Sequence, residues 1–428
     1  MQRLPRMAAA LLPRELANWS LTAVALGALE GGLLGVIVKN QFADVAAPGA
    51  VNLAVAVVAA APSFANLASF LFASLAVGRD KLAVTSQLMR IMGFCLLVMA
   101  LPGPTRGGLL VFCLMAVVAR AAWSGILTLR AAVWRANYSR EWRGQVTARI
   151  VQLSSLLVAG FAALIGFLLD WREDAYRPAF LLGAACALYA ASVNRGVRVR
   201  RHRQLLAAEL AEQSLQGRRL SIAVLVRVLR NDVDFRRYMI GMMIFGSGNL
   251  MLIPILVVQL NELLVLSQLN QVMIISTLPL LVLCFSIPFW ARLLDRMHIF
   301  TYRAMHSWCF VSSSALFCLA VISGRSEFLW PASVMLGAAY AGGHLGWNLG
   351  HNDFSSDATA SHYMAIHVTL TGIRGLVMPL VGVGFYQFLS AHWPGHASYA
   401  LLLSLGLTLA GSVNFVILHL ERKRRSPA

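Results

Sequence analysis

Long apolar segments follow one another along almost the whole chain, separated by short polar stretches. A helix needs about 20 mainly apolar residues to cross the hydrocarbon core of a bilayer. The apolar segments are too long and too uniform for the alternating strands, about ten residues each, of an outer-membrane barrel. They predict an all-α integral membrane protein with twelve transmembrane helices, at residues 17–38, 50–77, 84–102, 108–134, 147–169, 178–194, 237–260, 268–291, 303–323, 328–350, 362–390 and 396–419.

One long polar segment, 195–236, divides the predicted spans into two sets of six. We therefore expect an N-terminal six-helix bundle at 1–194, a basic amphipathic cytoplasmic linker, and a C-terminal six-helix bundle with a short basic tail at 237–428. The linker either lies along the inner membrane surface or is a solvated connector. A weak internal repeat, which aligns Glu30 with Asn249, indicates that the two halves arose by duplication.

Composition supports a membrane protein. Of 428 residues, 58% are hydrophobic and only 13% are charged, whereas a soluble domain has about 25% charged residues. The net charge of +18 comes from lysine and arginine in alternate connecting segments. This bias predicts a multi-pass protein of the bacterial cytoplasmic (inner) membrane with both termini cytoplasmic, and it explains the basic charge without nucleic acid. The six cysteines lie in apolar runs and predict neither a disulfide nor a zinc site.

Three ionisable residues fall near the middle of predicted spans: Glu30, Arg120 and Arg374. Such side chains are costly in a bilayer, so they are expected to face a cavity and to have partners. We predict that Glu30 carries a proton and that Arg120 and Arg374 bind an anion, because the planar guanidinium suits carboxylate or phosphate. The alternative for each residue is a structural contact between helices.

A polar stripe runs along the tenth predicted span. Tyr340, His344, Asn348 and His351 follow at steps of four, four and three residues, which places them on one helix face. His344 is a candidate proton-sensitive group, with a packing role as the alternative, and Tyr340 and Asn348 are candidate substrate contacts together with Asn249. His344 and His351 are too far apart to share one metal ion, and we expect neither a metal nor a cofactor.

Short inner-loop motifs resemble those of the major facilitator superfamily, and the resemblance covers essentially the whole chain. The family signature Gly-x-Leu-x-Asp-Arg-x-Gly-Arg-Arg is matched in part by Ala-Arg-Leu-Leu-Asp-Arg, which ends at Arg296. The corresponding segment of the first half, 73–81, lacks the aspartate. The resemblance implies that Asp295, Arg296 and Arg79 contribute to a charge latch for the outward-open state.

A second motif concerns Arg120. The family pattern Leu-x-x-Arg-x-x-Gln-Gly of the fourth span is matched only at its arginine. In proton-coupled members of the family this arginine is linked to proton movement, which the resemblance extends to Arg120. The Gly-Pro step typical of antiporters is missing from 159–166.

These features favour a proton-coupled secondary transporter that moves a small organic anion by alternating access. Two alternatives stay open: an exporter of cationic or lipophilic compounds, and a non-transporting assembly or partner protein with the same fold. The sequence has no phosphate-binding loop for ATP and no catalytic constellation, so we expect that it is not an enzyme. The expected partners are a small-molecule substrate, protons and membrane lipid, but no nucleic acid, and the protein is expected to be a monomer.

Overall fold

The computed structural model describes residues 6–138, 140–215, 222–355, 360–393 and 395–425. Linker residues 216–221 and loop residues 356–359 lie outside this description. Within the described ranges every regular element is a helix, as the sequence predicts.

The helices of the N-terminal half correspond in order to the first six predicted spans. They are α1 (Arg6–Ala28), α2 (Gly31–Gln41), α3 (Pro48–Ala65), α4 (Ser69–Leu75), α5 (Lys81–Ala100), α6 (Arg106–Asn137), α7 (Arg140–Trp171) and α8 (Tyr176–Arg195). The linker contains two short helices, α9 (His202–Leu215) and α10 (Ile222–Asn231).

The C-terminal half begins directly after α10. Its helices are α11 (Val233–Glu262), α12 (Gln268–Val272), α13 (Leu278–Leu294), α14 (Ile299–Ser323), α15 (Leu329–Leu349), α16 (Ala360–His392) and α17 (Leu401–Arg425). A π-helical turn, Met273–Thr277, joins α12 to α13.

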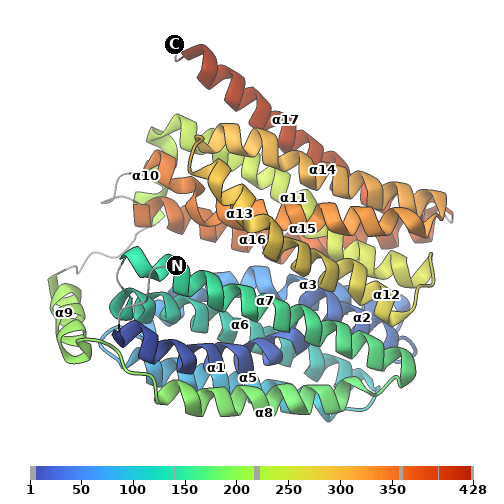
Figure 1. The fold of residues 1–428 in the computed structure, drawn as a ribbon. Coiled ribbons are helices and arrows are strands. Elements are labelled where there is room, and N and C mark those ends of the chain that lie inside the picture. Colours follow the sequence, from blue (N-terminus) through green and yellow to red (C-terminus); the bar gives the residue numbers. More distant parts are fainter. Residues whose placement is uncertain (1–5, 139, 216–221, 356–359, 394, 426–428) are drawn as a thin grey trace.

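The two halves lie one above the other in Figure 1. In the N-terminal half α5 packs against α6 and α8, and α1 packs against α7 and α8. In the C-terminal half α11 packs against α16 and α17, and α15 packs against α13 and α14. The halves meet where α3 contacts α16, α2 contacts α11, and α7 contacts α12 and α13.

Ten helical segments in the described part of the chain are long and apolar enough to cross a membrane. The protein is therefore an integral, multi-pass membrane protein. The predicted count of twelve is not confirmed, because α3 and α15 are not among these ten segments. A 3-10 turn at Asn66–Ala68 follows α3 inside the second predicted span. Glycine and polar side chains dilute the apolar character of α15.

The first predicted span is not one continuous helix, which corrects the sequence-based prediction. It breaks between α1 and α2, and Glu30 is the N-cap residue of α2. Its Oε2 accepts a hydrogen bond of 2.8 Å from the backbone N–H of Leu33. A carboxylate at this position satisfies a backbone donor that the helix leaves unpaired and interacts favourably with the helix dipole. Gly31 and Gly32 follow, so the first two residues of α2 carry no side chain.

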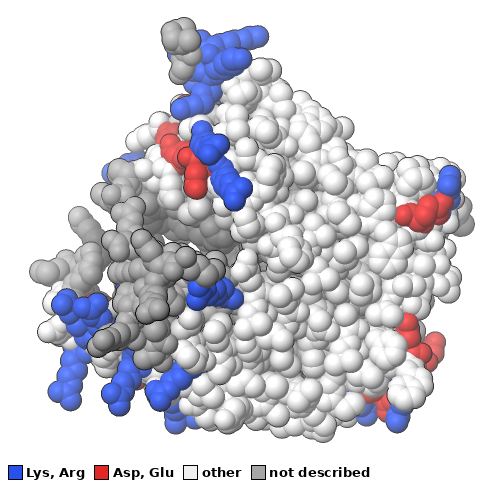
Figure 2. All heavy atoms as spheres, viewed as in Figure 1, with Lys and Arg blue, Asp and Glu red and all other residues white. Residues whose placement is uncertain are grey.

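Basic side chains gather at one end of the molecule. Figure 2 shows lysine and arginine concentrated at the end that carries α9, α10 and the C-terminus of α17. We call this the basic end. The other end, where α2 and α11 finish, is called the opposite end. The surface between them in this view is almost devoid of charged residues, as expected for a surface in contact with lipid.

Candidate functional site

Electrostatic interactions, without an ion pair among the described residues, link three predicted site residues at the break in the first span. Glu30 interacts electrostatically with Arg120 of α6 and with Tyr340 of α15. Glu30 and Arg120 belong to the N-terminal half, whereas Tyr340 belongs to the C-terminal half. The site therefore lies where the halves face each other, and a helix terminus with its backbone N–H groups contributes to it.

The side chains of this site keep hydrogen-bonding capacity. Glu30, Arg120 and Tyr340 are each half-buried. The Nε atom of Arg120 is buried without a hydrogen-bond partner among the described residues. The ring of Tyr340 packs edge-on against Phe310, with ring centroids 5.9 Å apart. This arrangement offers a guanidinium and a phenol to a ligand next to a titratable carboxyl group.

The polar stripe of α15 continues from this site toward the basic end. His344 and Asn348 are both exposed, and the Asn348 side chain donates a 2.7 Å hydrogen bond to the backbone carbonyl of His344. Steps of four residues keep them on the helix face that Tyr340 presents. Trp347 donates to the hydroxyl of Thr371 at 3.3 Å, which ties the neighbouring face of α15 to α16.

Two predicted site residues have other surroundings. The guanidinium of Arg374 donates to the backbone carbonyl of Met242 on α11, and only 6% of Arg374 is exposed. Asn249 accepts a 3.3 Å hydrogen bond from Thr408 on α17. Both residues thus have hydrogen-bond partners inside the C-terminal half, and the role of Arg374 as an anion contact stays a prediction.

The opposite end is closed by bonds that cross between the halves. Lys39 of α2 forms an ion pair with Glu262 of α11 and donates to Asn52 at 2.6 Å. Asp170, at the end of α7, accepts backbone N–H bonds of 2.6 and 3.2 Å from the start of α12. These contacts join both sides of the molecule at the end of the spans.

Two further bonds support this closure. Asn261 donates to Asn40 at 2.8 Å, and Gln387 of α16 donates to the backbone carbonyl of Gly49 at 2.7 Å. Together with the preceding pairs, they hold the described loops and helix ends of the two halves together at the opposite end.

The basic end has a different arrangement. Within the described residues, its ion pairs connect the N-terminal half to α9 or stay inside the C-terminal half. Lys81 pairs with Glu209 of α9 at 2.6 Å, and Arg237 forms two bonds of 2.5 and 2.9 Å with Glu421. No such bond crosses between the halves in the described part of this end.

The predicted latch residues lie at this basic end. Asp295, Arg296 and Arg79 are exposed, and in the described part of the chain none of the three has a side-chain ion pair. Their role as a latch stays a prediction.

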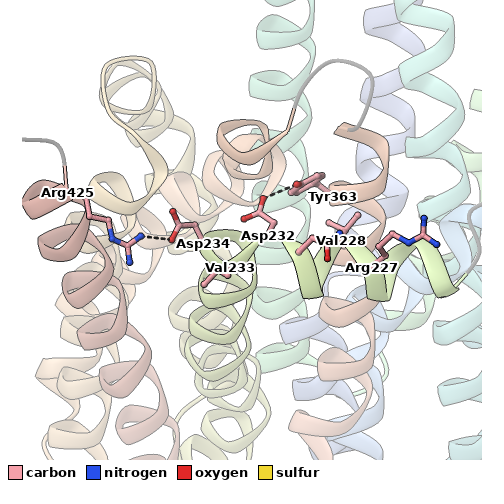
Figure 3. A pocket seen from close by; sticks show the side chains of 8 residues that line it. Arg227, Val228, Asp232, Val233, Asp234, Tyr363 and Arg425 are labelled. Carbon is pink, nitrogen blue, oxygen red and sulfur yellow. Dashed lines mark hydrogen bonds and ion pairs between the residues drawn. The ribbon is translucent and has the colours of Figure 1, made fainter.

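A surface pocket of about 650 Å³ opens at the basic end beside the start of α11. Figure 3 shows the two carboxylates that line it already paired: Tyr363 donates to Asp232 at 2.8 Å, and Arg425 lies 3.2 Å from Asp234. Asp232 also caps α11 by accepting from the N–H of Phe235 at 2.9 Å. The pocket is therefore a structured helix junction of one half.

Sequence reasoning missed a buried carboxyl group in α1. Glu15 is only 2% exposed, and its Oε2 accepts from the indoles of Trp19 and Trp134 at 2.8 and 3.3 Å. Arg130 stacks on both indoles, 4.7 and 4.4 Å from the ring centroids. The spacing of four residues between Glu15 and Trp19 was an available signal, but the partners on α6 are more than a hundred residues away.

The described residues contain no group of three or more histidine, cysteine, aspartate or glutamate side chains arranged to hold a metal ion.

Comparison with known proteins gives a match in structure. Neither a protein-family model nor a curated protein sequence matches the chain. The fold is similar to that of a point mutant of the nucleoside transporter NupG, with a TM-score of 0.71, 13% identity, and coverage of 95% of this chain and 99% of that one. A D-xylose-proton symporter also has a TM-score of 0.71, with 14% identity and coverage of 95% and 97%.

The POT family transporter PepTSo is similar over 99% of this chain and 100% of its own, with a TM-score of 0.71 and 10% identity. Identities this low show a shared fold. All three neighbours are transporters by name, and the chain shares their fold.

Proposed function

We propose that the protein is a secondary active transporter that moves a small solute across the bacterial cytoplasmic membrane by alternating access. The observation that carries this proposal is the meeting of Glu30, Arg120 and Tyr340 from both halves at a broken transmembrane helix. A site between two halves becomes accessible to alternate sides when the halves rock against each other. The structural neighbours, which are transporters by name, support the same class of function.

The sidedness follows from charge. The end rich in arginine faces the cytoplasm under the positive-inside rule, so both termini are cytoplasmic. The opposite end, closed by Lys39 and Glu262, then faces outward. We infer an inward-facing state from the bonds that close the opposite end, and in such a state a cytoplasmic latch that includes Asp295, Arg296 and Arg79 would be open.

Proton coupling is proposed to work through competition at Arg120. When Glu30 is ionised, its carboxylate neutralises the nearby guanidinium, and an anionic solute gains little by binding there. When Glu30 takes up a proton, the positive charge of Arg120 is available to a small organic anion. Tyr340 and Asn348 line the path, and His344 is a second group that can exchange protons with the cytoplasmic side.

The central site is proposed without Arg374 and Asn249, because each forms a hydrogen bond inside the C-terminal half, Arg374 to the backbone of α11 and Asn249 to Thr408 of α17. The segments 1–194 and 237–428 are proposed to move as two bodies joined by the linker 195–236. Membrane lipid, protons and one small solute are the proposed partners, with no nucleic acid, cofactor or metal, and the protein works as a monomer.

The test is transport by purified protein in proteoliposomes under an imposed pH gradient, with a panel of labelled organic anions and organic cations. We expect anion flux that follows the gradient, and we expect Glu30→Gln to abolish its pH response. Glu173→Gln is the matched control, because Glu173 is an exposed residue of the connection between α7 and α8. A Glu30→Gln variant with the parental pH response contradicts the coupling role, and flux of cations alone contradicts the anion assignment.

A further inference from the structure

Four basic side chains are buried together in the C-terminal half. Arg303 of α14 is 1% exposed, Arg374 and His351 are each 6% exposed, and His367 of α16 is fully buried. Arg374 interacts electrostatically with Arg303, and His367 interacts with both arginines and with His351. Arg303, the first residue of the ninth predicted span, is therefore part of the protein interior.

The described residues give this cluster no counter-charge. In that part of the chain, neither Arg303 nor Arg374 lies within ion-pair distance of a carboxylate. A buried charge without a partner costs several kcal/mol. Repulsion between the two guanidinium groups increases the free-energy cost of burying them. The cluster is therefore destabilising in the absence of a bound anion.

Several hydrogen-bond donors and acceptors in the cluster also lack partners among the described residues. The unsatisfied buried atoms are Nε and Nη2 of Arg303, Nε of Arg374, both ring nitrogens of His367, Nδ1 of His351 and the hydroxyl of Tyr238. Buried polar groups are nearly always hydrogen-bonded in folded proteins. So many unsatisfied atoms in one cluster indicate a missing partner that has several acceptor atoms.

Glycines hold both guanidinium groups close to helix backbones. A Cβ atom built at Gly346 of α15 would lie 2.8 Å from Cζ of Arg303, and one built at Gly246 of α11 would lie 2.2 Å from Cζ of Arg374. The two arginines thus approach from α14 and α16 into space that only glycine leaves open.

We propose that Arg303, Arg374 and His367 form a binding site for a small oxyanion, meaning a phosphate, sulfate or carboxylate group. Such a group supplies both the missing negative charge and several acceptor oxygens, and it matches the planar fork of arginine. Water would satisfy donors but would leave the charge uncompensated. The inference goes beyond the proposed function, because binding at this site does not require transport.

The experiment measures inorganic phosphate binding to the purified, delipidated full-length protein in detergent by isothermal titration calorimetry, with chloride at equal ionic strength as reference. We expect saturable binding to the parent protein and at least tenfold weaker binding to Arg303→Gln and Arg374→Gln. The matched control is Arg292→Gln, because Arg292 is an exposed arginine of neighbouring α13 and should leave phosphate affinity unchanged.

Arg303→Lys is a control for misfolding, because lysine keeps the positive charge but lacks the planar guanidinium. We expect this variant to elute like the parent protein in size-exclusion chromatography. We also expect it to bind phosphate several-fold more weakly than the parent does. Absence of phosphate binding by the parent, or equal binding by parent, Arg303→Gln and Arg374→Gln, overturns the proposal. Neither outcome of the phosphate-binding experiment changes the outcome expected for transport by Glu30→Gln, so the two proposals can fail independently.

A second arm identifies the natural source of the oxyanion. The protein is placed in nanodiscs of phosphatidylcholine alone or with added phosphatidylglycerol, and phosphate binding is measured again. Phosphate affinity that falls only with the anionic lipid shows that a lipid headgroup occupies the site, whereas equal affinity in both shows a soluble anion. Both results support an oxyanion site, and loss of binding in Arg374→Gln is required in either case.

Discussion

Among the described residues, a half-buried arginine of the N-terminal half has a carboxylate in its network, and the buried arginines of the C-terminal half do not. The guanidinium of Arg130 lies over the rings of Trp19 and Trp134, and both indoles donate to the carboxylate of Glu15. Arg130 interacts electrostatically with Glu15 without forming an ion pair. Arg303 and Arg374 are more deeply buried, interact with each other, and have no ion-pair partner in the described part of the chain.

This difference separates two uses of a buried charge. A guanidinium compensated by the protein, such as Arg130, belongs to a permanent network and stabilises the side-chain contacts between α1 and α6. Guanidinium groups without compensation, such as Arg303 and Arg374, destabilise the folded protein until an anion binds to them. Two halves built from similar helices can thus differ in function. The N-terminal half contains the carboxylate that compensates its arginine, whereas the C-terminal half is arranged to bind an anion as the counter-charge.

The largest expected effect comes from breaking the compensated network. Glu15→Gln keeps the shape of the side chain but leaves Arg130 without its negative partner, so we expect a loss of about 2–3 kcal/mol in the free energy of unfolding. Thermal unfolding of the detergent-solubilised protein measures it, with the exposed Glu173→Gln as control. An unfolding temperature equal to that of the parent would show that Glu15 does not compensate Arg130.

A matched pair of substitutions then compares the halves directly. Arg130→Met removes a compensated charge and is expected to destabilise the protein, whereas Arg303→Met removes an uncompensated one. In phosphate-free buffer we expect Arg303→Met to raise the free energy of unfolding by about 1–2 kcal/mol, because nothing offsets the desolvation of its buried charge. The same thermal assay applies to both variants. Equal destabilisation by the two substitutions would remove the distinction between the halves.

A smaller change probes the geometry of the uncompensated cluster. In Gly246→Ala the new Cβ would lie 2.2 Å from Cζ of Arg374, so the guanidinium must move. We expect phosphate affinity to fall about tenfold, which corresponds to about 1.4 kcal/mol. Gly160→Ala is the control, since nothing lies within 4 Å of a Cβ at that helical glycine. Parental affinity in Gly246→Ala would show that Arg374 does not contact the anion.

The smallest effect concerns the basic end of the C-terminal half. His298 caps α14, its Nδ1 accepting from the N–H of Phe300 at 3.2 Å. Burial lowers the pKa of His298, the positive charge of Arg422 lowers it further, and Asp353 opposes both. The folded protein thus binds this proton less readily than the unfolded chain does.

Because the folded-state pKa of His298 is depressed, its contribution to stability is complete above the ordinary histidine pKa of about 6.5 and is lost as the pH falls below it. We expect the unfolding temperature of the parent to decline over this range more steeply than that of His298→Asn, which caps a helix without titrating. Arg422→Gln should weaken the decline. Identical pH profiles for parent and His298→Asn would contradict this role.

Much of the candidate site could be predicted residue by residue. The cost of an ionisable group in a bilayer singled out Glu30 and Arg120, and helix periodicity placed Tyr340 on the face that meets them. The same argument singled out Arg374 but could not predict its partner, because a mid-span arginine can also donate to the backbone of a neighbouring helix, here Met242. The break at Glu30 was missed because hydropathy averages over a whole span, whereas a cap depends on one carboxylate and one N–H.

The sequence by itself determined the class of the protein: long apolar segments in a bilayer must be helices, since no other local structure pairs their backbone groups. The distribution of arginine predicts their orientation. The tertiary structure alone decided which charges are compensated. Glu15 and Trp134 are 119 positions apart, and Arg303 and Arg374 belong to different helices. Electrostatic compensation depends on distances of a few ångströms between helices, and those distances are set by packing rather than by the order of residues.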